Sequence, residues 1–173
     1  WQIYPEKSSV NYCLFVSPLD EEKYFFNREG LVIQINTTTK TIQTTDRIAS
    51  FNLAEDNIFT CNCDNSDRIS DIEGADILFL QNDTIFVTDN TLPFTKLYVS
   101  FLVRNSWKVS RKEFLTKNDL LQCNDIVLCS SFFGLQWVSK VLYCENSTIA
   151  TSYHSYDYAR TLHAEMQKFI TEL

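Results

Sequence analysis

Short apolar segments separated by polar turns recur along the chain and constrain its fold more than any other feature. They are rich in β-branched and aromatic residues, which favour strands. Residues 96–103 alternate most regularly, with Leu97, Val99, Phe101 and Val103 on one face, and this period-two pattern predicts a further strand. We therefore expect a mainly β, β-dominated α+β fold. The other expected strands are residues 9–17, 31–35, 37–47, 57–63, 77–80, 84–88, 126–130, 137–143 and 148–156.

Two segments have helical spacing instead. Residues 111–122 predict a short helix, with Phe114, Leu115 and Leu121 near helical positions. The C-terminal segment predicts an amphipathic helix, for which Thr161 is a candidate N-cap. Its single apolar stripe is formed by Leu162, Met166, Phe169, Ile170 and Leu173.

Composition narrows the classes of partner. The hydrophobic fraction of 45% is typical of a globular protein, and the net charge of −7 disfavours nucleic acid as the main partner. The basic residues between positions 104 and 117 are interpreted as a solvated face. No run approaches the roughly 20 apolar residues that span a bilayer, so no membrane partner is expected.

Candidate chemistry is sparse. The only two histidines, His154 and His163, do not stand beside a legible nucleophile, so we predict a non-enzyme without cofactor. Cys61 and Cys63 lack the spacing and second pair of a zinc site. The acidic segment 64–76 lacks the ligand spacing of a calcium loop, and we interpret it as a solvated loop without metal.

The cysteines are compatible with either a secreted or a cytoplasmic protein. Their even number, with sequons at Asn36, Asn82 and Asn146, would suit a secreted, disulfide-containing β-barrel of lipocalin-like size that binds a small ligand or receptor. Cys129, however, lies in an apolar run, which favours reduced thiols and a cytoplasmic location. The six cysteines are Cys13, Cys61, Cys63, Cys123, Cys129 and Cys144.

Aromatic side chains crowd the last third of the chain and form the candidate binding site. Aromatic faces at a barrel mouth can hold a cation such as a guanidinium, through cation–π attraction. We place the site on Phe132, Phe133, Trp137, Tyr156, Asp157 and Tyr158.

This last third resembles a Tudor domain. Three pieces in order and at suitable spacing carry the resemblance, namely DIVLC from Asp125, QWVSKV from Gln136 and YHSYDYAR from Tyr153. The resemblance implies a small curled barrel over residues 118–173, closed by the terminal helix and packed with a second β-rich subdomain over residues 1–117. Ser155 and Arg160 stand where the family has a cage aromatic and an Asn, so we expect a degenerate methylarginine cage.

The resemblance also implies a role. It indicates a non-catalytic adaptor or scaffold domain in small-RNA silencing of the piRNA type or in germ-granule assembly. The implied partner is an Argonaute-type or other scaffold protein, and the implied location is the cytoplasm, either within granules or outside them.

Overall fold

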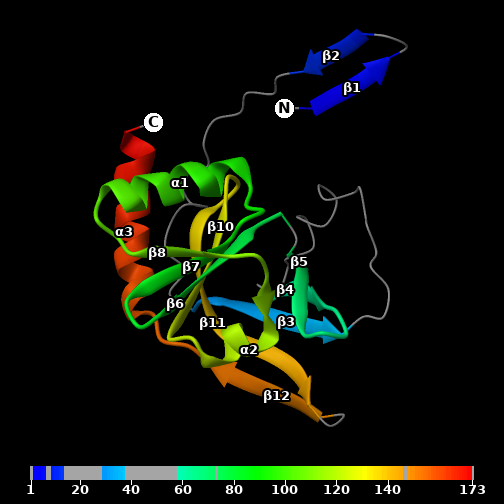
Figure 1. The fold of residues 1–173 in the computed structure, drawn as a ribbon, viewed down its shortest axis with the longest axis vertical. Helices are drawn as coiled ribbons and strands as arrows, with labels where there is room; N and C mark the ends of the chain where they lie inside the picture. The colour runs from blue at the N-terminus through cyan, green and yellow to red at the C-terminus, as the bar shows by residue number, and fades with distance from the viewer. Residues whose placement is uncertain are drawn as a thin grey trace.

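The computed structural model describes residues 2–6, 9–13, 29–37, 58–72, 74–145 and 148–172. Most strands join one nearly closed, barrel-like sheet in the order β8-β7-β6-β10-β11-β3-β4-β5-β9, with β12 paired to β11 (Figure 1). A separate two-stranded sheet pairs β1 (Gln2–Glu6) with β2 (Ser9–Cys13). The strands of the large sheet are β3 (Leu31–Thr37), β4 (Ile58–Cys63), β5 (Arg68–Ile72), β6 (Asp76–Gln81), β7 (Thr84–Thr88), β8 (Val109–Lys112), β9 (Leu115–Thr116), β10 (Asp125–Ser130), β11 (Gly134–Glu145) and β12 (Thr148–Tyr153).

The central strands are buried on both faces because they separate two apolar clusters. Ile126 and Leu128 of β10 belong to the cluster inside the curled sheet, whereas Val127 belongs to the cluster beneath two helices. Alternate side chains of a strand point to opposite faces, so an uninterrupted apolar run fits this position. The helices are α1 (Pro93–Arg104), α2 (Lys117–Gln122) and α3 (Asp157–Thr171).

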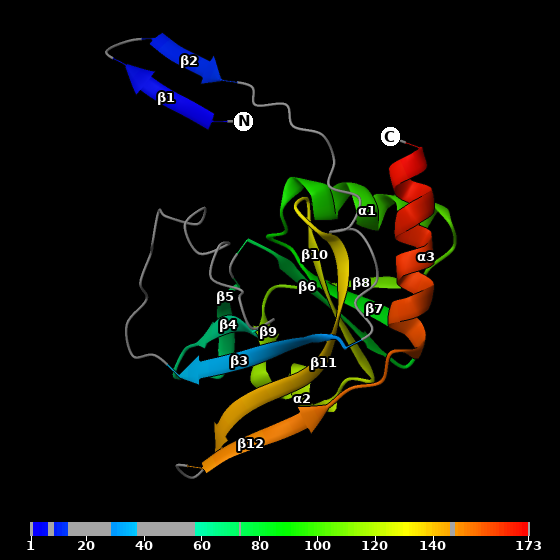
Figure 2. The ribbon, with the colours of Figure 1, turned by 180° about the vertical axis from the view of Figure 1, so that it is seen from behind.

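Helices α1 and α3 lie side by side over one face of the sheet (Figures 1 and 2). The Phe169 ring of α3 contacts the rings of Phe94, Tyr98 and Phe101 of α1, with centroids 5.5–5.7 Å apart. The buried Tyr98 hydroxyl donates a hydrogen bond to the Leu162 carbonyl at 2.7 Å. Packing of this apolar face fixes both helices on the sheet.

The predicted hairpin between β6 and β7 is confirmed. Asn82 and Asp83 form its two-residue turn, and both have positive φ, of 49° and 59°. Short polar side chains tolerate this left-handed region better than others, and a two-residue turn with both φ positive suits the twist of a hairpin.

The strand prediction for residues 96–103 is wrong, because these residues form most of α1. Leu97 and Val103, assigned to the buried face, are 56% and 55% exposed, whereas Tyr98 and Leu102 are fully buried. The apolar residues of this segment fit both the period of a strand and that of a helix, since residues 94, 98, 101 and 102 have helical spacing. Pro93 at the first helical position favours the start of a helix.

Other boundaries also differ. The predicted helix 111–122 is only half helical, since β8, β9 and α2 divide it, and the predicted loop 64–76 contains strand β5. The terminal helix is confirmed, but it begins at Asp157, so Thr161 lies within it and does not cap it. The expected strand 37–47 lies outside the described residues, except Thr37.

Strands from both proposed subdomains pair in one sheet. Strand β10 pairs with β6, and β11 pairs with β3 in parallel. The division at residues 117 and 118 stays a prediction. The mainly β character and the terminal helix are confirmed.

Candidate active site

A pocket opens at one edge of the large sheet, where several strand ends meet. Strands β7 and β8 run parallel and end at this edge, and the antiparallel β6 begins there. The cavity measures about 290 Å³, near the lower end of the range of about 300–1,000 Å³ for small-molecule sites. It is lined by Ile69, Ile72, Gly74, Ala75, Asp76, Ile77, Thr88, Asn90, Leu92, Glu113, Phe114 and Leu115.

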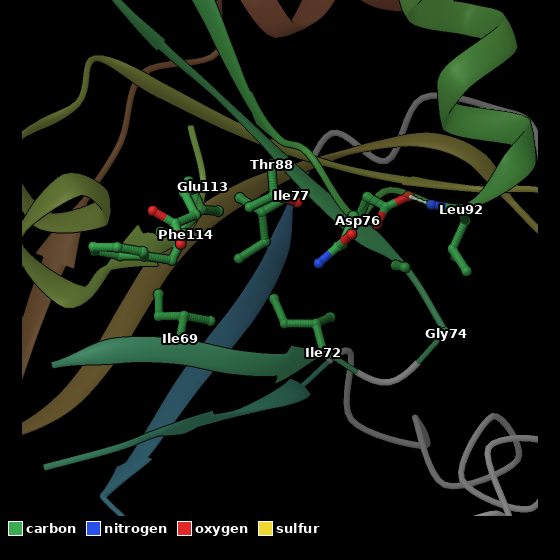
Figure 3. A pocket seen from close by; sticks show the side chains of 12 residues that line it. Ile69, Ile72, Gly74, Asp76, Ile77, Thr88, Leu92, Glu113 and Phe114 are labelled. Carbon is green, nitrogen blue, oxygen red and sulfur yellow. Dashed lines mark hydrogen bonds between the residues drawn. The ribbon is translucent and has the colours of Figure 1, made fainter. Parts of the chain in front are cut away.

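The pocket joins apolar walls to two carboxylates. Figure 3 shows Asp76 and Glu113 on opposite sides of the space, with Ile69 and Ile72 below them. Thr88 and Asn90 add a hydroxyl and an amide to the lining. An apolar cavity with a few convergent polar groups is the usual form of a small-molecule site.

Asp76 is held in place by the start of α1. Its Oδ2 accepts a hydrogen bond from the Leu92 backbone N–H at 2.8 Å. Leu92 is the N-cap residue of α1 and has no side chain that can cap the helix. A carboxylate near a helix N-terminus is favoured by the helix dipole, so this bond secures both α1 and the pocket wall.

Two described cations next to lining residues in the sequence or in space contact other groups. The Arg68 guanidinium lies 4.1 Å from the centroid of the Phe114 ring, and Lys112 Nζ lies 2.6 Å from Asp119 Oδ1. Neither cation is part of the lining, and within the described residues the lining contains no lysine or arginine. Among the described residues of the lining, the charged side chains are those of Asp76 and Glu113.

A second polar group of residues is buried between β10, β12 and α3. Asp125, 1% exposed, accepts hydrogen bonds from the Ser155 hydroxyl at 3.0 Å and from the Tyr158 backbone N–H at 3.2 Å. The Trp137 indole N–H donates to the Ser155 carbonyl at 2.8 Å. Asp125 thereby caps the first turn of α3, whose own N-cap residue makes no side-chain bond.

Cys123 and His154 meet beside this group. The thiol sulfur lies 3.9 Å from Nδ1 of the imidazole, and both residues are buried. Burial raises the pKa of the Cys123 thiol to about 12 and lowers the pKa of His154. Both groups are therefore neutral, whereas a cysteine nucleophile requires a depressed thiol pKa. This contact could not be predicted from the sequence, because 31 residues separate the two positions.

The predicted aromatic site is only partly brought together. Trp137 and Tyr156 form an edge-on pair with centroids 5.5 Å apart. Phe133 instead packs against Phe59 in the cluster inside the sheet, and Phe132 is 56% exposed. The last two predicted residues make other contacts. Asp157 is the first residue of α3, and the Tyr158 hydroxyl donates a hydrogen bond to Asp83. Ligand binding by these residues stays a prediction.

Cys63, Cys123 and Cys129 are free thiols, and Cys61 is likewise not part of a disulfide. Within the described ranges, no three histidine, cysteine or acidic side chains gather as a metal site, and none of the helices is long and apolar enough to cross a membrane. The cytoplasmic location and the secreted alternative stay predictions.

Comparison with solved structures relates the fold to aminotransferases. A hypothetical aminotransferase from Mycobacterium tuberculosis in its PLP-bound form matches with a TM-score of 0.64 and 10% identity, over 91% of this chain and 61% of that one. A putative branched-chain amino acid aminotransferase from Thermotoga maritima gives 0.62 and 10%, over 83% and 56%. The 4-amino-4-deoxychorismate lyase from Pseudomonas aeruginosa gives 0.59 and 12%, over 88% and 60%.

These likenesses show the fold alone. The chain spans about three fifths of the length of these structures. No family model and no curated protein matches the sequence.

The comparison corrects the functional predictions. The Tudor resemblance is wrong, because the matching structures are aminotransferases and a lyase. The predictions of a non-catalytic adaptor, of a role in RNA silencing or germ granules, and of a non-enzyme are contradicted by the same structures, and the lipocalin-like alternative has no support. The three C-terminal motifs reproduce a strand–strand–strand–helix order that this fold also contains.

One of the matching structures is a form that holds pyridoxal phosphate. This cofactor needs a lysine amine for its aldehyde and an anchor for its phosphate. The described lysines do not line the pocket: Lys112 pairs with Asp119, and Lys168 pairs with Glu165. Lys7, Lys23 and Lys40 lie outside the described residues. The described groups around the pocket do not fit the cofactor.

Proposed function

We propose that this chain is part of an enzyme of the aminotransferase and 4-amino-4-deoxychorismate lyase fold, and that it acts on a small molecule that carries an amino group. The observation that carries the proposal is the likeness of fold over 78–91% of the chain. The matching structures bear the names of enzymes whose substrates are amino compounds.

The chemistry of the pocket supports an amino compound. A protonated amine is attracted to carboxylates, and Asp76 and Glu113 lie on opposite walls. The apolar residues Ile69, Ile72 and Phe114 can cover the carbon skeleton of the same molecule. The pocket would thus orient a ligand with one charged end and one apolar end.

Neighbouring elements hold the Asp76 carboxylate in a fixed position. Asp76 is fixed by its bond to Leu92, and α1 is in turn held by the Tyr98–Leu162 hydrogen bond to α3. A carboxylate held by packed elements loses little conformational entropy when it binds a ligand.

A turnover assay tests the proposal. The protein is incubated with added pyridoxal 5′-phosphate and a mixture of L-amino acids and α-keto acids, and separately with the same cofactor and 4-amino-4-deoxychorismate, and consumption is followed by mass spectrometry. We expect consumption of one amino compound, reduced at least roughly tenfold by Glu113→Gln, because Glu113 is one of the two charged groups of the pocket. Asp89→Asn serves as the matched control, since Asp89 is exposed and does not line the pocket. Failure to consume any amino compound would contradict the proposal.

A further inference from the structure

We propose that strand β12 is an interaction surface, on which a second copy of this chain pairs its own β12 in antiparallel orientation. Strand β12 lies on the outer side of β11 (Figures 1 and 2), and among the described strands only β11 pairs with it. The edge of a sheet presents backbone N–H and C=O groups that another strand can meet. Pairing there is independent of the proposed reaction, because no residue of β12 lines the pocket.

A backbone hydrogen bond shows which residues of β12 face outward. The His154 N–H donates to the Ser139 carbonyl of β11 at 3.1 Å, so His154 faces β11. Successive residues of an antiparallel strand direct their N–H and C=O groups to opposite sides. The groups of Ile149, Thr151 and Tyr153 therefore point away from β11. Thr151 is exposed, and Tyr153 is 73% exposed.

Strand β12 lacks the features by which proteins prevent pairing at a sheet edge. Such edges usually carry charged residues or proline, contain a bulge, or are very short. The six residues TIATSY include no charged residue and no proline, and their register with β11 has no shift. By contrast, the strands at the two ends of the large sheet are protected, since β8 carries Arg111 and Lys112 and β9 has two residues.

A second copy fits this edge because β12 is complementary to itself. A two-fold axis at Thr151 places Thr151 opposite its own copy and position 149 opposite position 153, and all of these residues face outward. Such pairs exchange two backbone hydrogen bonds each. Thr–Thr pairs and pairs of a β-branched with an aromatic residue are favourable across strands, and no like charges meet. Two-fold dimers are also the commonest oligomers of soluble proteins.

Sedimentation equilibrium of the intact chain, at concentrations up to roughly 1 mM, tests the proposal. We expect a monomer–dimer equilibrium. Thr151→Pro should weaken dimerisation at least roughly tenfold, because proline removes an outward N–H and is tolerated in an edge strand. Thr151→Lys should weaken it as well, because two like charges would meet at the axis. Thr161→Lys is the matched control, since it adds the same charge at an exposed position of α3.

Hydrogen exchange of the wild-type protein gives a readout that needs no variant. The amides of Thr151 and Tyr153 should exchange more slowly as the protein concentration rises, because their N–H groups are bonded only in the dimer. A protein that stays monomeric up to roughly 1 mM would overturn the proposal. A dimer that folded Thr151→Pro and Thr151→Lys both retain would overturn it too, as would a dimer in which these two amides exchange at the rate of the monomer.

Discussion

The hydroxyl of Tyr98 in α1 donates a hydrogen bond to the carbonyl of Leu162 in α3, at 2.7 Å and away from solvent. This bond joins the two helices that cover one face of the sheet, and burial raises the pKa of the Tyr98 phenol. Because α1 begins at the pocket, the bond also supports the position of Leu92 and its partner Asp76.

Tyr98→Phe should lower the free energy of unfolding by about 0.5–1.5 kcal/mol, because the buried hydrogen bond from the Tyr98 hydroxyl to the Leu162 carbonyl would be lost. Urea unfolding followed by circular dichroism measures the change. Tyr153→Phe is the control, since Tyr153 is 73% exposed. Equal stability of the two variants would show that the Tyr98 hydroxyl contributes nothing to helix packing.

The helical assignment of α1 gives a second prediction. Leu102→Ala should lower the free energy of unfolding by about 2–5 kcal/mol, because Leu102 is fully buried. Leu97→Ala should change it by less than about 0.5 kcal/mol, because Leu97 is mostly exposed. A strand with period two would bury Leu97 and expose Leu102, so the opposite ranking would favour a strand here.

Acid should destabilise the protein through His154. Burial lowers the pKa of His154 in the folded state, so the unfolded chain, with a pKa of about 6.5, binds the proton more readily. The free energy of unfolding should therefore fall as the pH decreases below about 6.5, by up to about 1.4 kcal/mol per pH unit for one proton. Unfolding curves from pH 7.5 to 5.5 measure this slope.

His154→Gln is the matched variant for the acid effect, and it should show a shallower slope. Burial also raises the pKa of Asp125, which acts with the opposite sign at lower pH, so the comparison is kept above pH 5.5. An unchanged slope in His154→Gln would assign the acid sensitivity to another group.

Asp125 gives a fourth prediction, because it connects β10 to the first turn of α3. Asp125→Ala would leave the Ser155 hydroxyl and the Tyr158 N–H without their acceptor. We expect a loss of about 1–3 kcal/mol in the free energy of unfolding. Asp157→Ala, at an exposed position of the same turn, should cost less. A larger loss in Asp157→Ala would show that the helix is capped locally.

Some of this structure could be predicted from the sequence. The apolar stripe of Leu162, Met166 and Phe169 predicts α3 because a helix on a sheet needs such a stripe. The β6–β7 hairpin follows from two apolar runs joined by a short polar turn. Helix α1 was not predicted, because its apolar residues fit both the spacing of a strand and the spacing of a helix. Which of them are buried distinguishes the two, and burial is known only from the structure.

The pocket could not be predicted, because its walls come from residues distant in the sequence. Asp76, Leu92 and Glu113 meet only after β6, β7 and β8 have paired at one edge of the sheet. The contact between Cys123 and His154 has the same origin. The Tudor resemblance failed for a related reason: three short strands and a helix specify local order, whereas the fold depends on the parallel pairing of β11 with β3.

The central claim is that the pocket accepts an amine. Calorimetry with pyridoxamine and 4-deoxypyridoxine tests it most directly, because the two ligands share the same ring and differ by the amine. We predict that pyridoxamine binds at least roughly tenfold more tightly, a difference of about 1.4 kcal/mol, and that Glu113→Gln weakens its binding. Equal binding of the two ligands would contradict the claim, as would the absence of binding by either.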